Sequence, residues 1–142
     1  MKIYCIDEFR KEYGLLIKNK SYKSLENLTI THFSDKTIDE LRSGRNLNQS
    51  QIVPFIKHRL GGSGGFRVYY ILLLKDDCVY LAFVHPKTGS KGAENISVKS
   101  ISNLQKKVLE AIASKSLYEI IIDKKTKKIK FSKVKKLVTN TL

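Results

Sequence analysis

The chain has 142 residues, and 27 lysines and arginines against 13 acidic residues give it a formal net charge of +14. This length favours one domain that buries roughly 68% of the surface exposed by the unfolded chain, so no disulfide is needed for stability. No apolar run approaches the ~20 residues of a membrane span, and the first apolar run is too short for a signal peptide. The basic excess favours a polyanionic partner: nucleic acid, an acidic protein or, less well, an anionic membrane surface.

The two cysteines indicate a reducing environment. Cys5 and Cys78 both lie inside apolar runs and share no Cys-x-x-Cys spacing, which is typical of buried free thiols. We therefore expect a cytoplasmic protein.

The first part of the chain predicts a strand followed by two helices. Residues 2–6 alternate weakly, as in a short strand, and Asp7 suits the N-cap of a helix in which Phe9 and Tyr13 have helical spacing. A second helix is predicted over 22–33.

A loop and a strand come next. Residues 36–41 predict one more helical turn, and the Ser, Gly, Asn and Gln content of 42–51 predicts a loop. Pro54 limits the following strand, 55–60, to an edge or to a position where a strand begins. Side chains alternate along a strand, so Phe55, Lys57 and Arg59 are expected to share one face.

The most apolar part of the chain begins after the glycine-rich stretch 61–65. Two β-branched and aromatic runs, 66–74 and 78–84, are separated by three residues, two of them Asp, which predicts a β-hairpin. Residues 85–92 are expected to form a basic loop, because a proline and two glycines do not continue a central strand.

A helix and a second hairpin end the chain. Apolar residues recur at helical spacing over 98–113, with Asn95 or Ser97 as the cap. Short apolar segments at 116–122 and 129–134 flank a lysine-rich turn and predict a very basic hairpin. No repeat or long linker divides the chain.

The glycine-rich stretch has two interpretations. Glycines let backbone N–H groups approach a phosphate closely, but no Gly-Lys-Ser/Thr triplet and no helix follow, so the P-loop and Rossmann patterns fail. Gly61-Gly62-Ser63-Gly64-Gly65 also fits the letters Gly-x-Ser-x-Gly without the strand-turn-helix context of a hydrolase. A mobile inter-strand loop and a contact to a nucleic-acid backbone both stay open. His32, His58 and His85 are too far apart in sequence to suggest metal-ligand spacing, and no cofactor is expected.

Three cations on adjacent predicted strands are the best candidate for chemistry. Strand alternation can place Lys57, Arg59 and Arg67 on one face, and Arg67 begins an apolar strand, where rigid backbone would hold its guanidinium. Cations at fixed positions stabilise the extra negative charge that develops when an RNA 2′-hydroxyl attacks the adjacent phosphate. His58 or His85 would then carry the proton. The alternative is that these cations only solvate a sheet edge.

The residues around this cluster resemble a known family. They are the segment 55–60, the block Gly64-Gly65-Phe66-Arg67-Val68, the strand 78–84 and the basic turn that begins His85-Pro86-Lys87. Over roughly residues 3–113 the chain resembles the RelE/ParE superfamily of type II toxin–antitoxin toxins, in the branch with a Gly-rich basic loop.

The resemblance implies an α+β fold with two N-terminal helices packed on a curved antiparallel sheet, followed here by a C-terminal helix and a basic hairpin extension, 114–142. It implies a metal-independent endoribonuclease that cleaves mRNA on the ribosome and leaves a 2′,3′-cyclic phosphate. A cognate antitoxin protein that wraps the basic face is the implied partner, alongside mRNA and the ribosome and without a membrane.

Family roles carry over to individual residues. Arg67 matches the arginine that stabilises the transition state, while Lys57 and Arg59 match paired basic residues on the preceding strand. Lys87 falls near a basic loop residue, and Lys91 is a weaker match. The two histidines and the turn lysines inherit no family role; extra phosphate binding is expected of the turn, with a solvated hairpin as the alternative. The full set of expected RNA-binding residues is Lys87, Lys91, His58, His85, Lys124, Lys125, Lys127 and Lys128.

Two departures keep other functions open. Residues 94–98 lack the base-stacking tyrosine of some members, and the segment after Ala113 inherits no family role. One alternative is a ParE-type toxin that inhibits gyrase without cleavage, although retention of Lys57, Arg59 and Arg67 favours cleavage. Another is a basic nucleic-acid-binding module without activity, whose binding would fall steeply with salt.

Overall fold

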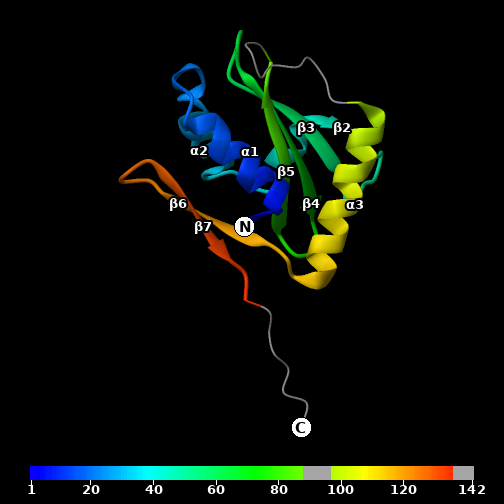
Figure 1. The fold of residues 1–142 in the computed structure, drawn as a ribbon. Coiled ribbons are helices and arrows are strands. Elements are labelled where there is room, and N and C mark those ends of the chain that lie inside the picture. Colours follow the sequence, from blue (N-terminus) through cyan, green and yellow to red (C-terminus); the bar gives the residue numbers. More distant parts are fainter. Residues whose placement is uncertain (88–96, 136–142) are drawn as a thin grey trace.

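The computed structural model describes residues 1–87 and 97–135, and over these the fold is α+β, with three α-helices and a seven-stranded mixed sheet (Figure 1). The strands are β1 (Lys2–Cys5), β2 (Arg45–Asn46), β3 (Phe55–Leu60), β4 (Phe66–Leu73), β5 (Cys78–Pro86), β6 (Tyr118–Asp123) and β7 (Lys128–Lys133). The helices are α1 (Asp7–Ile17), α2 (Leu25–Phe33) and α3 (Val98–Ser114), with short 3₁₀ turns at Lys20–Tyr22 and Glu40–Ser43.

The strand order is β2-β3-β4-β5-β1-β6-β7, and one pair within it is parallel. β1 runs parallel to β5, with Lys2 opposite Cys78, and every other pair is antiparallel. The expectation of a wholly antiparallel sheet was therefore wrong at this pair. Parallel neighbours need a long crossover, and the segment from α1 to β4 supplies it, a pairing that the local pattern of β1 does not reveal.

The C-terminal hairpin belongs to the same sheet. β6 pairs with the free edge of β1 and β7 pairs with β6. Ile120 is buried in the core beneath α1 and α2, and Phe131 packs against that core. The segment predicted as an extension thus contributes two strands and apolar contacts to the main body.

Helices cover both faces of the sheet (Figure 1). On one face, Phe9 and Tyr13 of α1 and Leu25 of α2 pack with Val68 and Leu81. The other face is covered by α3. Its residues Leu104 and Val108 pack there against residues of β3, β4 and β5. The two predicted N-terminal helices and the helix predicted over 98–113 are confirmed as elements, and Ser97 Oγ caps α3 by accepting from the Ser100 N–H at 3.1 Å.

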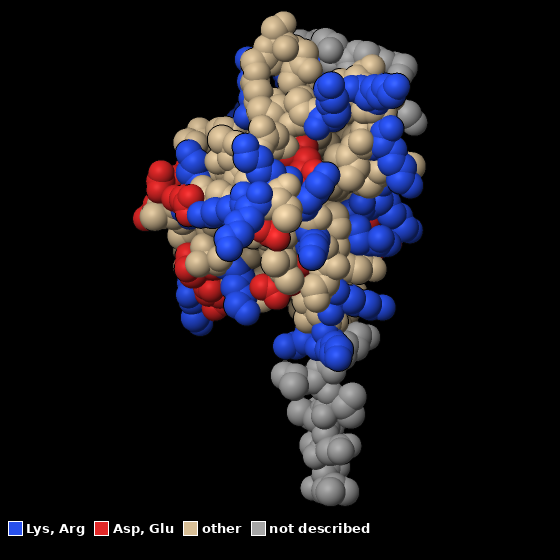
Figure 2. Space-filling model, turned by 90° about the vertical axis from the view of Figure 1, so that its left-hand side faces the viewer, with Lys and Arg blue, Asp and Glu red and all other residues tan. Residues whose placement is uncertain are grey.

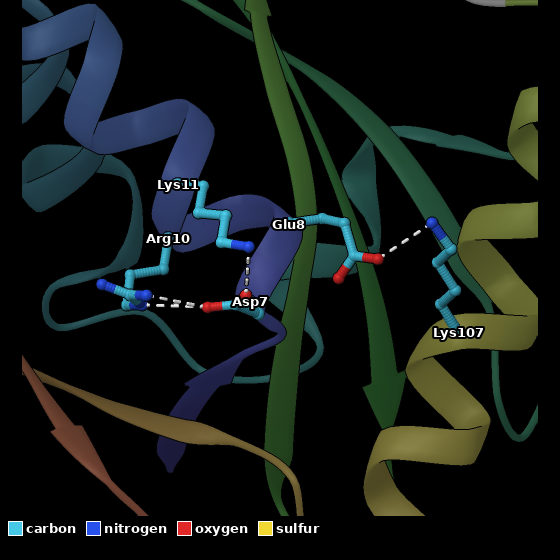
Figure 3. A network of polar contacts seen from close by, with 5 residues as sticks. All are labelled: Asp7, Glu8, Arg10, Lys11 and Lys107. Carbon is cyan, nitrogen blue, oxygen red and sulfur yellow. Dashed lines mark hydrogen bonds and ion pairs between the residues drawn. The ribbon is translucent and has the colours of Figure 1, made fainter.

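The start of α1 differs from the prediction. Asp7 is the first helical residue rather than the N-cap, which is Ile6. The Asp7 carboxylate accepts hydrogen bonds from Arg10 at 2.9 and 3.1 Å and pairs with Lys11 at 3.0 Å (Figure 3). These contacts lower the pKa of Asp7, with Lys11 the largest cause. An acidic residue in the first turn also suits the helix dipole.

The β5 strand is longer than predicted and includes His85 and Pro86. Phe66 pairs with Pro86 and Arg67 with His85, so the expectation that a basic loop starts at His85 was wrong at its first two residues. Among the described residues, β1 pairs with β5 only as far as Leu81, so Pro86 lies in an edge section of β5, where a missing N–H is tolerated. A β-bulge between Tyr69 and Tyr70 shifts the register of this pair.

Two further expectations concern cysteines and membranes. Cys5 and Cys78 are buried and free, as predicted, and burial raises the pKa of Cys5 to about 12. None of the helices within the described residues is long and apolar enough to span a bilayer.

Candidate functional site

Four cations from three adjacent strands lie on one face of the sheet. In the strand register, Arg45 of β2 is opposite Lys57 of β3, and Arg59 of β3 is opposite Arg67 of β4. Directly opposite residues in antiparallel strands point to the same side. The side is the one covered by α3, because Phe55, which shares one face of β3 with Lys57 and Arg59, packs there.

These four side chains meet at a pocket of about 400 Å³. Its lining consists of Gly44, Arg45, Lys57, His58, Arg59 and Arg67, and none of these described residues is acidic. Arg59 is exposed at the rim, whereas Arg67 is only 7% exposed. The structure therefore brings together all three predicted catalytic residues, with Arg67 deepest.

The pKa of Lys57 is lowered in this environment. Burial of the amine is the largest cause, and the positive charges of Arg67, Arg45 and Arg59 act in the same direction. Each of these effects disfavours the protonated amine. Lys57 is thus closer to accepting a proton near neutral pH than an ordinary lysine is.

Gly44 allows the loop before β2 to pack closely against β3. A Cβ atom at this position would lie 2.5 Å from the Lys57 carbonyl oxygen and 2.6 Å from Ile56 Cγ2. No side chain fits at such distances, so glycine is required for Arg45 to enter β2 beside Lys57. The following loop is held by Asn48, whose amide donates to the Val53 carbonyl and accepts from the Phe55 N–H. Composition predicted a loop over 42–51 but not the short strand or this close approach.

The glycine-rich stretch forms a compact turn between β3 and β4. Gly61 and Gly64 have φ of 78° and 73°, a region that favours glycine. A Cβ atom on Gly65 would lie 2.2 Å from the Leu60 carbonyl oxygen. The Gly65 N–H donates to Gly62, and its carbonyl accepts from the Lys87 N–H at 2.9 Å. These two hydrogen bonds stabilise the turn and join Lys87 to Gly65. Lys87 therefore lies at the end of β4 that carries Arg67.

A pair of stacked histidines lies beside the pocket. The ring of His58, a pocket residue, stacks on His32 of α2 with centroids 4.1 Å apart. His32 Nε2 also lies 3.3 Å from the Tyr70 hydroxyl. Burial lowers the pKa of His32 to about 4, and His58 and Lys36 contribute in the same direction. Sequence analysis missed this pair because 26 positions separate the two residues and no local pattern links them.

His85 lies behind the pocket rather than in its lining. It is 4% exposed and sits directly across β4 and β5 from Arg67. Its Nε2 is 2.9 Å from the Tyr69 hydroxyl and its Nδ1 is 3.0 Å from the Pro86 carbonyl. With both ring nitrogens bonded within the protein, His85 is not placed to exchange a proton with a bound substrate.

The lysines of the β6–β7 turn are not brought to the pocket. Lys124 pairs with Asp35 beyond α2, and Lys128 pairs with Glu26 of α2 at 3.6 Å. In the strand order, β7 is at the opposite edge from β2 and β3. The face that includes α2 shows lysines and arginines interspersed with acidic residues rather than one continuous basic patch (Figure 2). Lys91 lies outside the described residues.

An ion pair that passes β5 joins helix α1 to helix α3. Glu8 of α1 reaches past this strand to Lys107 of α3, with an ion pair of 2.9 Å (Figure 3). Both residues also line a second pocket of about 290 Å³ with Phe83, Asn103 and Leu104. The pair is half-exposed and adds little to the apolar packing of Leu104 and Val108 that holds α3 on the sheet.

Comparison with models of protein families found no match, and comparison with curated proteins found none either. The geometry of the pocket and the resemblance of its residues are therefore what indicate a function.

Proposed function

We propose that the protein is an endoribonuclease, the toxin of a type II toxin–antitoxin system with a RelE-like fold, that cleaves mRNA on the ribosome. The observation that carries this proposal is the meeting of Lys57, Arg59 and Arg67 in one pocket, with Arg67 nearly buried at its base. A guanidinium offers several donors in a fixed fork that matches phosphate oxygens. A phosphodiester group of a nucleic acid is the anion that such a pocket fits.

Each basic residue of the site has its own role in the proposed cleavage. Arg67, on the interior strand β4, stabilises the charge that builds on the phosphate oxygens as the 2′-oxygen attacks phosphorus. Lys57, with its lowered pKa, takes the 2′-hydroxyl proton. Arg59 holds the phosphate at the rim, and Lys87 grips the flanking backbone. The bond to the 5′-oxygen breaks and the departing oxygen takes a proton from water, which leaves a 2′,3′-cyclic phosphate and a 5′-hydroxyl.

The cellular partners follow from the same proposal. The substrate is mRNA in the decoding site of a ribosome, and the location is the cytoplasm. A cognate antitoxin neutralises the toxin by covering the basic face. The net charge of +14 supports polyanionic or acidic partners of this kind.

The test is to add the purified chain to a bacterial translation extract and map the 5′ ends of the mRNA by primer extension. The mapped site is then synthesised with one 2′-deoxynucleotide at the cut, which removes the attacking hydroxyl. We expect ribosome-dependent cuts in the natural RNA, a cyclic phosphate at the new 3′ end, and no cut at the substituted position.

Other results would contradict the proposal in different ways. Cleavage that survives the 2′-deoxy substitution would exclude attack by the neighbouring hydroxyl. RNA that stays intact but is bound with steep salt dependence would indicate a binding module. Intact RNA with inhibition of gyrase would indicate a toxin of the ParE type.

A further inference from the structure

The pocket is backed by two buried aromatic residues that face its cations in the strand register. Tyr69 is directly opposite Lys57 across β3 and β4, and His85 is directly opposite Arg67 across β4 and β5. Tyr69 is 0% exposed and His85 is 4% exposed. The two rings stack with centroids 5.5 Å apart. Each of the two central cations therefore has one member of this pair as its neighbour on the adjacent strand.

The hydrogen bonds of His85 fix its tautomer and its charge. A carbonyl oxygen only accepts, so the bond to Pro86 requires a proton on Nδ1. In the neutral ring Nε2 is then an acceptor, and the Tyr69 hydroxyl donates to it at 2.9 Å. Protonation of Nε2 would give two donors facing each other unless the hydroxyl rotated away. The arrangement thus holds an oriented, uncharged imidazole beside the pocket.

The groups that face His85 also favour its neutral form. Burial lowers the pKa of His85, and the positive charges of Arg67 on β4 and Lys57 on β3 act in the same direction. The Pro86 carbonyl and Glu12 of α1 oppose them. A charged imidazole here would repel both cations, whereas the neutral ring packs beside them and leaves their positions undisturbed.

We propose that Tyr69 and His85 are a positioning pair, which holds Arg67 and Lys57 in the geometry needed for RNA cleavage without touching the substrate. The inference depends on the proposed function. Its physical basis is that cleavage requires the cations at fixed places relative to phosphorus, and a misplacement of about 1 Å can cost on the order of 100-fold in rate.

Three variants of the full chain test this pair in single-turnover cleavage on programmed ribosomes. Tyr69→Phe removes only the hydroxyl that donates to His85. Tyr80→Phe is the matched control, since Tyr80 is also buried on the α3 side of the sheet but stacks on Tyr4. His85→Gln keeps an oxygen that can accept from Tyr69 and never becomes charged.

We expect Tyr69→Phe to lower the cleavage rate by about 10- to 100-fold, while Tyr80→Phe stays within about twofold of wild type. Binding of an uncleavable 2′-O-methyl RNA, measured by fluorescence anisotropy, should be the same in all variants. Wild-type cleavage should decline with falling pH as Lys57 protonates, and more steeply below the ordinary histidine range, where His85 takes up a proton. His85→Gln should retain most of the neutral-pH rate and lose only this additional steepness.

The outcomes separate the inference from the proposed function. Wild type that cleaves no RNA overturns both. Wild type that cleaves, with Tyr69→Phe equal to Tyr80→Phe, overturns the positioning pair alone. So does an acidic decline that is unchanged in His85→Gln, or a loss of rate in Tyr69→Phe that is matched by an equal loss of RNA binding.

Discussion

Two basic regions of the molecule, the pocket and the β6–β7 turn, hold their charges in different ways. In the pocket, strand register places Arg45, Lys57, Arg59 and Arg67 side by side, and Arg67 is 7% exposed. On the β6–β7 turn the lysines are exposed, with side chains of Lys124 and Lys128 61% and 66% accessible. Positive charge alone attracts a polyanion, but only fixed and partly desolvated cations can direct chemistry at one phosphorus atom. Lysine density therefore shows where this protein carries charge, whereas strand register shows where its candidate site lies.

The sharpest test of the comparison removes one cation from each region. Arg67→Ala should lower the cleavage rate by about 10²- to 10³-fold, the usual loss when a donor to the developing charge is deleted. Lys124→Ala should change the rate by no more than about twofold, because it alters an exposed ion pair. Single-turnover rates on the same mRNA measure both. Equal losses in the two variants would remove the distinction between the regions.

Stability of the Arg67 variant needs its own control. If Arg67→Ala lowers the melting temperature, Arg67→Lys separates the causes, because lysine keeps the charge and the apolar stem but loses the planar fork. We expect Arg67→Lys to melt like wild type and still to cleave slowly. A fully active Arg67→Lys would show that charge is sufficient and that the guanidinium geometry is not used.

The next effect concerns how the pocket is built. Gly44→Ala should destabilise the fold by about 1–3 kcal/mol, since its Cβ would overlap the Lys57 carbonyl and Ile56. Gly14→Ala is the matched control: apart from the adjacent backbone of α1 itself, nothing lies within 4 Å of the added Cβ, and alanine should stabilise a helix by roughly 0.5–1 kcal/mol. Urea unfolding measures both changes. A Gly44→Ala variant as stable as wild type would mean that this loop shifts freely.

A smaller effect arises at α2, which touches both regions through the His32–His58 stack and the Lys128–Glu26 pair. The pKa of His32 is about 4 in the folded chain, below its ordinary value. The unfolded chain therefore binds more protons between pH 6.5 and 4, and stability must fall as the pH drops through that window. His32→Gln should flatten the curve by on the order of 1 kcal/mol, allowing for the partial exposure of His32. Melting temperatures across this pH range provide the measurement, and parallel curves for the two proteins would contradict the prediction.

The smallest effect is expected at the hairpin turn. Replacing Lys124, Lys125, Lys127 and Lys128 with Gln removes four exposed charges and two ion pairs to acidic residues. For each lysine that touches a phosphate, the replacement should make the slope of log affinity against log salt shallower by about 0.7 for single-stranded RNA. We expect a change of no more than about 3 in slope, with the single-turnover cleavage rate retained. A cleavage rate that drops as far as in Arg67→Ala would place the turn in the catalytic machinery.

The candidate site could be predicted in part. The alternation of residues 55–60 was sufficient to place Lys57 and Arg59 on one face, and the apolar run after the glycines made Arg67 the start of a strand. Alternation along one strand does not show which residues of neighbouring strands lie opposite each other. The strand register shows that Arg67 lies opposite Arg59 on β3 and opposite His85 on β5. Arg45 was missed because a two-residue strand leaves no periodic signal.

The sequence by itself determined the element types, because helical and strand periodicity are local properties of side-chain spacing. Strands 55–60 and 66–74, the helix after Ser97 and the basic hairpin all follow from such patterns. Tertiary structure alone decided the parallel pairing of β1 with β5, the addition of β6 and β7 to the same sheet, and the contact between His32 and His58. These features join residues distant in sequence, and their free energy comes from burial and pairing that exist only once the chain has folded.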